Sequence, residues 1–197
     1  MKKVGLLFGS FNPITNSHIA LGTKALAHVN EVWFVLSPAS PVKHGKNILI
    51  DEYHRWAMLN LALMDEDETR LIACDIELKL DKPSWTHITI QKLKEKNPET
   101  SFNMICGFDV LNYLKKWKET DYVIESMDGF ISQERNDISI DISETIKQKL
   151  TILPAQEGQV SSTLVRDNVR NKKPIHHLIS PSVYYYIKEQ NIYTNEQ

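Results

Sequence analysis

The stretch LLFGSFNPITNSH, residues 6–18, decides the fold of this chain. Its first part is an apolar run that ends at Phe8, as is typical of a buried strand, and Ser17 opens a helical pattern. Gly9, which begins the connection, has no side chain to keep a ligand from the backbone, and Pro13 stiffens the turn. The amides of a first helical turn point outward and favour an anion. We therefore predict a strand, a ligand-binding loop and a helix, in that order.

The same alternation continues along the chain. Strands that alternate with helices of about ten residues indicate βαβ units, and so an α/β fold with a parallel sheet and helices on both faces. Ligands of such sheets bind beyond the carboxyl ends of the strands, so site residues are expected in the loops that follow strands. We predict strands at 3–8, 31–37, 70–77, 101–106, 129–132 and 151–153, and helices at 17–29, 51–64, 86–97, 109–114, 122–125, 161–171 and 182–190.

Composition narrows the class of protein. The chain has 197 residues, 42% of them hydrophobic and 24% charged, which is typical of a globular protein with a sizeable core. One domain over 1–197 is the simplest interpretation, with a C-terminal helical region from about 160 packed on it. The polar segment 134–149 is interpreted as a surface insertion. The net charge of −2 argues against a nucleic-acid partner bound through phosphate neutralisation.

The two cysteines and the lengths of the apolar runs indicate the compartment. Cys74 and Cys106 lie in apolar runs, and we interpret them as reduced core residues. No apolar run approaches the roughly 18 residues that a membrane span needs. A cytoplasmic protein without a membrane partner is expected, and the oligomeric state stays open, with a homo-oligomer among the alternatives.

Two helix starts carry residues suited to phosphate chemistry. In the first loop, Thr15 and His18 are three residues apart and share a helix face, so that the imidazole can donate to a phosphate oxygen. The alternative is a capped helix start with an incidental histidine. In VSSTLVR, Arg166 lies one turn beyond Ser162 and Thr163, and its planar fork matches phosphate oxygens. Here the alternative is a serine cap beside a solvated arginine.

Other post-strand segments carry weaker candidates. Lys43 and Lys46 are interpreted as phosphate contacts or as surface lysines, and Asp109 as a ribose acceptor or as a helix cap. Trp85 and Trp117 could each stack on a flat ring or belong to the core. No P-loop motif and no GxGxxG is present, so a nucleotide would be held by a different arrangement of residues.

The segments GSFNPITNSH and SSTLVR together resemble the nucleotidylyltransferase superfamily with (H/T)xxH and ISSTxxR motifs. Within it the chain is similar to nicotinate and nicotinamide mononucleotide adenylyltransferases, which carry similar segments in the same order over nearly the whole length. These segments are PASPVKHGK, CDIELKLDKPSWTHIT, FNMICGFDVLNYLKKW and HHLISPSVYYYIKEQNIY. Thr15 and Ser17 stand where the bacterial HxGH form has His and Gly, whereas a TN form occurs in the eukaryotic enzymes, so the base preference stays open.

The resemblance implies a Rossmann-like fold and a reaction in NAD biosynthesis. AMP would pass from ATP to the 5′-phosphate of nicotinate or nicotinamide mononucleotide, giving deamido-NAD or NAD and pyrophosphate. The resemblance assigns catalysis to His18, Thr15 and Arg166, and mononucleotide binding to Trp85, Thr86 and Trp117. Mg²⁺ is expected to travel with the ATP phosphates, without a dedicated metal site in the protein. The residues that it assigns to ATP and phosphate binding are Gly9, Ser10, Phe11, Lys43, Lys46, Gly107, Asp109, Arg135, Ser161, Ser162 and Thr163.

Two alternatives remain at this point. One is a pantetheine-phosphate adenylyltransferase or another small-molecule nucleotidylyltransferase of the superfamily. The pantetheine-phosphate enzymes share a PITNGH-like loop but are typically shorter and lack the SWT, GFD…KW and YIKEQNIY segments. The other is a non-catalytic nucleotide-binding regulator, which loss of His18 or Arg166 would favour; both residues are present.

Overall fold

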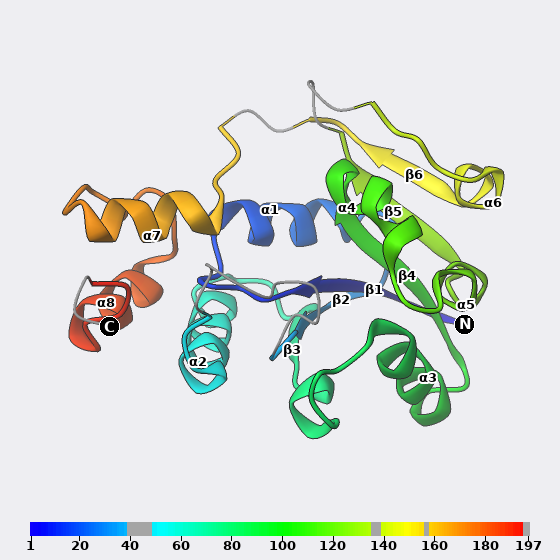
Figure 1. Ribbon diagram of the computed structural model, residues 1–197, viewed down its shortest axis with the longest axis horizontal. Helices are drawn as coiled ribbons and strands as arrows, with labels where there is room; N and C mark the ends of the chain where they lie inside the picture. The colour runs from blue at the N-terminus through cyan, green and yellow to red at the C-terminus, as the bar shows by residue number, and fades with distance from the viewer. Residues whose placement is uncertain (39–48, 135–138, 156–157, 195–197) are drawn as a thin grey trace.

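The computed structural model describes residues 1–38, 49–134, 139–155 and 158–194. Within these residues six parallel strands form one sheet in the order β3-β2-β1-β4-β5-β6, which confirms the predicted α/β class (Figure 1). In the register, Leu6 of β1 lies opposite Trp33 on one side and Met104 on the other. The strands are β1 (Lys2–Gly9), β2 (Glu31–Leu36), β3 (Leu71–Cys74), β4 (Thr100–Gly107), β5 (Gly129–Gln133) and β6 (Leu150–Leu153).

Helices cover both faces of this sheet. Figure 1 shows α2, α7 and α8 gathered at one end of the molecule and α3, α4, α5 and α6 at the other. The helices are α1 (Asn16–Ala25), α2 (Glu52–Met64), α3 (Thr86–Lys96), α4 (Phe108–Tyr113), α5 (Thr120–Ser126), α6 (Glu144–Gln148), α7 (Ser162–Arg170) and α8 (Pro181–Glu189), with short 3₁₀ helices η1 (Ile76–Lys79) and η2 (Leu114–Lys116).

The apolar core is divided by the sheet into two clusters. Alternation along β1 sends Leu7 into the first cluster, under α1, α2, α7 and α8, and sends Val4 and Leu6 into the second, under α3 to α6. The C-terminal helices share the first cluster, through Val165 of α7 and Val183 of α8. No helix in the described part of the chain is long and apolar enough to cross a membrane.

The strand order reverses at β1 and β4. The chain moves from β1 to β2 and β3 on one side, then returns to β4 on the other side of β1 and continues outward. In an open α/β sheet, the crevice beyond the carboxyl ends of the strands at such a reversal is where ligands bind. The fold therefore directs attention to the residues that follow Phe8 and Cys106.

Three predicted segments differ in part from the structure. The strand predicted at 70–77 ends at Cys74, because the chain turns at Asp75, whose carbonyl accepts from the Leu78 amide, into η1. The helix predicted at 17–29 ends at Ala25 and is followed by turns. The segment 134–149, which we interpret as a surface insertion, is mostly exposed in its described part, but Ile146 of α6 is buried in the second core cluster and anchors it to the fold.

Candidate active site

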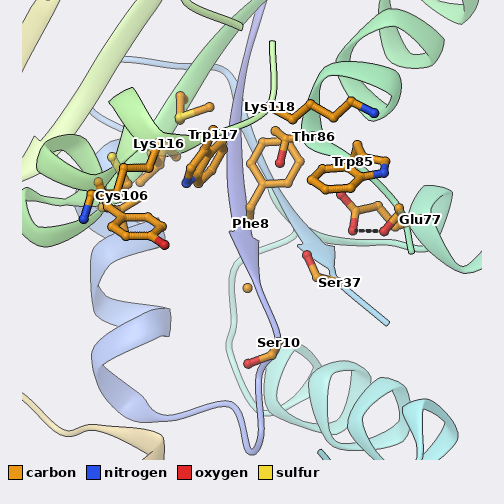
Figure 2. A pocket seen from close by; sticks show the side chains of 16 residues that line it. Phe8, Ser10, Ser37, Glu77, Trp85, Thr86, Cys106, Lys116, Trp117 and Lys118 are labelled. Atoms are coloured by element: carbon orange, nitrogen blue, oxygen red, sulfur yellow. Dashed lines mark hydrogen bonds between the residues drawn. The ribbon is translucent and has the colours of Figure 1, made fainter. Parts of the chain in front are cut away.

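A cavity of about 500 Å³ opens where β1 and β4 end (Figure 2). Phe8, Gly9 and Ser10 line it from β1, and Met104 and Cys106 line it from β4. Its position is the one that the reversal of strand order predicts. The remaining lining residues are Ser37, Glu77, Ser84, Trp85, Thr86, Ile105, Val110, Tyr113, Lys116, Trp117 and Lys118.

The two predicted ring-binding tryptophans both line this cavity. Trp85 is the residue that caps the start of α3, and Trp117 follows η2. In Figure 2 they lie on opposite sides of Phe8 and Thr86. Two flat aromatic side chains from separate elements thus border one cavity, and such side chains can stack on a flat ring.

Cys106 borders the same cavity but is not poised as a nucleophile. Its side chain is buried, and burial raises the pKa of the thiol to about 12. The reactive form of cysteine is the thiolate. At neutral pH Cys106 therefore stays protonated and acts as an apolar wall.

The histidine of the first loop is held in one tautomer. The backbone N–H of Thr15 donates to His18 Nδ1 over 3.1 Å, so Nδ1 must carry a lone pair. The Thr15 hydroxyl oxygen lies 2.8 Å from the same nitrogen and 3.2 Å from the Val160 carbonyl, and its single proton can be donated to either acceptor. Burial lowers the pKa of His18 to about 4. The imidazole is therefore neutral at physiological pH, with its proton on Nε2 available for donation.

Gly9 and Phe11 determine the shape of the loop between β1 and α1. A Cβ at Gly9 would lie 2.7 Å from the Phe11 ring, so the glycine makes room for that ring. Phe11 has a positive φ of 42°, is 2% exposed, and meets the His18 ring edge to face at 5.4 Å between centroids. The described contacts of the Phe11 side chain are thus with the core and with His18.

The two predicted phosphate motifs meet across more than 140 residues of sequence. Ser162 Oγ donates to the Pro13 carbonyl over 2.8 Å, and Arg166 donates to the Asn12 carbonyl over 2.7 Å. The Val160 amide donates to Ser17 Oγ over 2.7 Å. The start of α7 is thereby fixed beside the start of α1, and the outward amides of both helices lie in one region.

The side chains of the SST triplet are already engaged. Ser161 Oγ caps α7 by accepting from the Leu164 amide, and Thr163 Oγ1 accepts from Arg166 over 3.2 Å. Arg166 is 7% exposed, and its hydrogen bonds to Asn12 and Thr163 use only part of the guanidinium, which has five N–H donors. The rest of its fork can still meet an anion.

The remaining predicted residues divide into two groups. Gly107 is the residue that caps α4, and Asp109 stands in the first turn of this helix, next to Val110, which lines the cavity. A Cβ at Gly107 would lie 2.6 Å from Asp109 Oδ1, so the glycine makes room for this carboxylate. Lys43, Lys46 and Arg135 lie outside the described residues.

Two lysines that the sequence did not single out lie at the cavity. Lys116 and Lys118 flank Trp117, so the run KKWK itself was the available signal. Lys118 Nζ stands 4.8 Å from the ring centroid of Trp85. Within the described part of the chain neither lysine has a carboxylate partner, and both are available to an anionic ligand.

Arg55 of α2 holds together two segments next to the cavity, and the sequence did not single it out either. It is 1% exposed and donates to the carbonyls of Ser10, Ser37 and Pro38 over 2.6 to 2.8 Å. It thus joins the segments that follow β1 and β2. Its helical spacing to the apolar Met58 and Leu59 places it on the buried stripe of α2, which is the signal that could have revealed it.

The comparisons identify the family of the chain. A family model described as cytidylyltransferase-like matches residues 6–168, from β1 into α7. This range contains both helix starts and the whole lining of the cavity. The chain belongs to the cytidylyltransferase-like family.

The similar proteins are more specific. A Flavobacterium psychrophilum protein described as a probable nicotinate-nucleotide adenylyltransferase is 37% identical, with 97% of this chain and 98% of that protein covered. The nicotinate-nucleotide adenylyltransferase of Bacillus subtilis is 30% identical, with 98% and 99% covered. The Plasmodium falciparum nicotinic acid mononucleotide adenylyltransferase complexed with APC shares the fold, with a TM-score of 0.79, 22% identity and 98% of both chains covered.

Proposed function

We propose that this protein transfers AMP from ATP to the 5′-phosphate of nicotinate mononucleotide, giving deamido-NAD and pyrophosphate in NAD biosynthesis. One observation carries the proposal: a cavity bordered by Trp85 and Trp117 lies at the carboxyl ends of β1 and β4, beyond which the loop after β1 leads into α1, whose first turn carries His18. A flat pyridine ring fits between aromatic walls. The names of the similar bacterial proteins support the choice of nicotinate over nicotinamide.

The chemistry requires positioning and charge stabilisation rather than a protein nucleophile. When the mononucleotide phosphate attacks the α-phosphorus of ATP in line, negative charge builds up on the phosphate oxygens. His18 is held with Nε2–H free to donate to such an oxygen, and it needs no proton exchange to do so. The helix starts at Thr15 and Ser161 add backbone amides that favour anions. Arg166 provides the cation that grips the leaving pyrophosphate.

The remaining contacts follow from the family resemblance. Lys43 and Lys46 would assist at the phosphates, Gly107 and Asp109 would hold the adenosine, and Arg135 would lie near the adenine. We propose that Mg²⁺ arrives bound to ATP, where it neutralises phosphate charge. The outward backbone amides in the first turns of α1 and α7 suit the phosphates that carry the ion.

The cellular setting follows from the proposed reaction. The substrates are small phosphorylated nucleotides, so neither a nucleic acid nor a membrane is expected as a partner. We propose a cytoplasmic enzyme, because ATP is a substrate and the two cysteines form no disulfide.

The second candidate function is adenylyl transfer to phosphopantetheine. The same helix starts would serve it, but a flexible pantetheine arm has no use for two aromatic walls. The third is a non-catalytic nucleotide-binding regulator. His18 and Arg166 disfavour it, because both are present and each is fixed by hydrogen bonds.

Product analysis with ATP, Mg²⁺ and a panel of acceptors tests the proposal. The panel contains nicotinate mononucleotide, nicotinamide mononucleotide and phosphopantetheine. We expect deamido-NAD and pyrophosphate to form fastest. Preferential adenylylation of phosphopantetheine would contradict the proposal in favour of the second candidate, and no turnover with any acceptor would favour the regulator.

A further inference from the structure

Glu77 is a buried carboxylate that lines the edge of the cavity, and no sequence motif predicted it there. It lies in η1 and is 2% exposed. Ser84 Oγ donates to one carboxylate oxygen over 2.8 Å, and Thr89 Oγ1 donates to the other over 2.9 Å. The bond to Ser84 is the dashed line at Glu77 in Figure 2. Both hydroxyl residues are themselves buried, at 6% and 0% exposure.

The two anchor points stand on either side of the ring-binding residues. Ser84 immediately precedes Trp85 and Thr86, and Thr89 follows them by about one helical turn. Trp85 occupies the capping position of α3 and makes no side-chain cap bond. No side-chain cap bond fixes this helix start, and the bonds from Ser84 and Thr89 to Glu77 are side-chain hydrogen bonds that tie the segment to η1.

Burying the Glu77 carboxylate costs desolvation free energy, so this residue is an unfavourable choice for stability alone. Within the described residues no lysine or arginine pairs with it, and burial raises the pKa of its carboxyl group. An apolar side chain of similar size would avoid this desolvation cost. A fully hydrogen-bonded buried polar group does, however, specify one geometry, as a binding site needs.

We propose that Glu77 is a positioning residue for the acceptor base. It acts through Ser84 and Thr89 to hold Trp85 and Thr86 in the orientation that receives the pyridine ring. A wall that is ordered before binding spares the complex the entropy cost of ordering it afterwards. The identity of the ring rests on the proposed function; the ordering of residues 84–89 does not.

Four variants test the proposal by steady-state kinetics. Glu77→Leu should raise the KM for nicotinate mononucleotide about tenfold, within the range of lost base stacking, and should leave the KM for ATP within about twofold. Glu77→Gln should restore most of the affinity, because its amide can accept from one hydroxyl and donate to the other. Ser84→Ala and Thr89→Val should each give a smaller rise in the acceptor KM.

A double-mutant cycle separates positioning from plain stability. In a Trp85→Ala background, Glu77→Leu should raise the acceptor KM by less than it does in the wild type, because one of the two side chains through which it acts is gone. Additive effects, or an equal rise in both KM values, would overturn the proposal. Glu95→Gln is the matched control, since Glu95 is exposed on α3, the helix that Trp85 caps, and the variant should change neither KM.

Hydrogen exchange gives a readout that does not depend on activity. Amides in the segment 84–89 should exchange faster in Glu77→Leu than in the wild type, and nearly normally in Glu77→Gln. Unchanged exchange would overturn the inference even if the enzyme proves to use another acceptor. If Glu77→Leu fails to fold, the variants Ser84→Ala and Thr89→Val test the proposal instead. An acceptor KM equal to that of the wild type in both variants would overturn the proposal.

Discussion

The helix-start junction and the aromatic cavity are built by different means. At the junction, defined by Asn12–His18 and Val160–Arg166, hydrogen bonds from one segment satisfy the backbone of the other. The walls of the cavity are mostly apolar, and its aromatic side chains come from separate elements. Under the proposed function, the junction would fix donors for the reacting phosphates, whereas the cavity would select a flat ring by shape. Reaction rate should depend on the first region and choice of acceptor on the second.

His18→Ala should have the largest effect and should fall on turnover. Loss of a donor to charge in the transition state costs about 100-fold to 1000-fold in kcat. The acceptor KM should stay close to that of the wild type, because the tryptophans are untouched. Steady-state kinetics with both substrates varied checks this. His28→Ala, at an exposed histidine just beyond α1, should leave kcat unchanged, and normal turnover in His18→Ala would refute the assigned role.

Trp117→Ala should act on the other region. Removing one stacking surface costs about 1–3 kcal/mol per base, so the acceptor KM should rise roughly tenfold while the KM for ATP stays nearly constant. Trp56→Ala is a control, since Trp56 packs on the first core cluster away from the cavity. An unchanged acceptor KM in Trp117→Ala would remove the stacking role and weaken the comparison between the regions.

Ser162→Ala should loosen the junction with a modest effect on stability. The variant removes the donor to the Pro13 carbonyl, and a hydrogen bond of this kind contributes about 1 kcal/mol to the free energy of unfolding. Because Thr15 and His18 keep their own bonds, kcat should fall less than in His18→Ala. Urea denaturation and kinetics measure the two effects, and a kcat loss as large as that of His18→Ala would show that the hydroxyl itself serves catalysis.

The smallest effect is expected on the acid side of the pH profile. The pKa of His18 is lowered from 6.5 to about 4, so the side chain is neutral in the folded protein throughout pH 5–8. Protonation of His18 should therefore cause no loss of activity with a midpoint near pH 6.5. Imidazole NMR signals, assigned by comparison with His18→Gln, should show one ring that titrates near pH 4; a midpoint near 6.5 would contradict the buried neutral state.

The same shift has a consequence for stability. Between about pH 6.5 and 4 the unfolded chain takes up a proton at His18 that the folded chain does not bind. The contribution of His18 to stability is therefore fully present above pH 6.5 and is lost as the pH falls. His18→Gln should lose less stability than the wild type over that interval, as measured by denaturation at each pH.

Much of the arrangement was predictable because its signals are local. The apolar runs at 3–8 and 101–106 predicted β1 and β4, and the spacing of Thr15 and His18 predicted that they share a helix face. The third strand was predicted, but its predicted end at Glu77 was wrong, because an alternation of apolar and polar residues cannot show that the chain turns at Asp75 into η1. Arg55 and Glu77 escaped for a related reason. Charged residues usually lie at the surface, and only the partners that surround them in the fold explain their burial.

The sequence by itself determined the α/β class, the order of the strands and of the helices other than α6, and the two loops for which we predict phosphate chemistry. These depend on periodicity and on the residues of single turns, which are neighbours in the chain. Only the tertiary structure decided which nitrogen of His18 is free, which carbonyls Arg166 and Ser162 reach, and that Glu77 holds both sides of Trp85. Each of these depends on burial and on long-range or loop hydrogen bonds, which exist only after the sheet has brought the segments together.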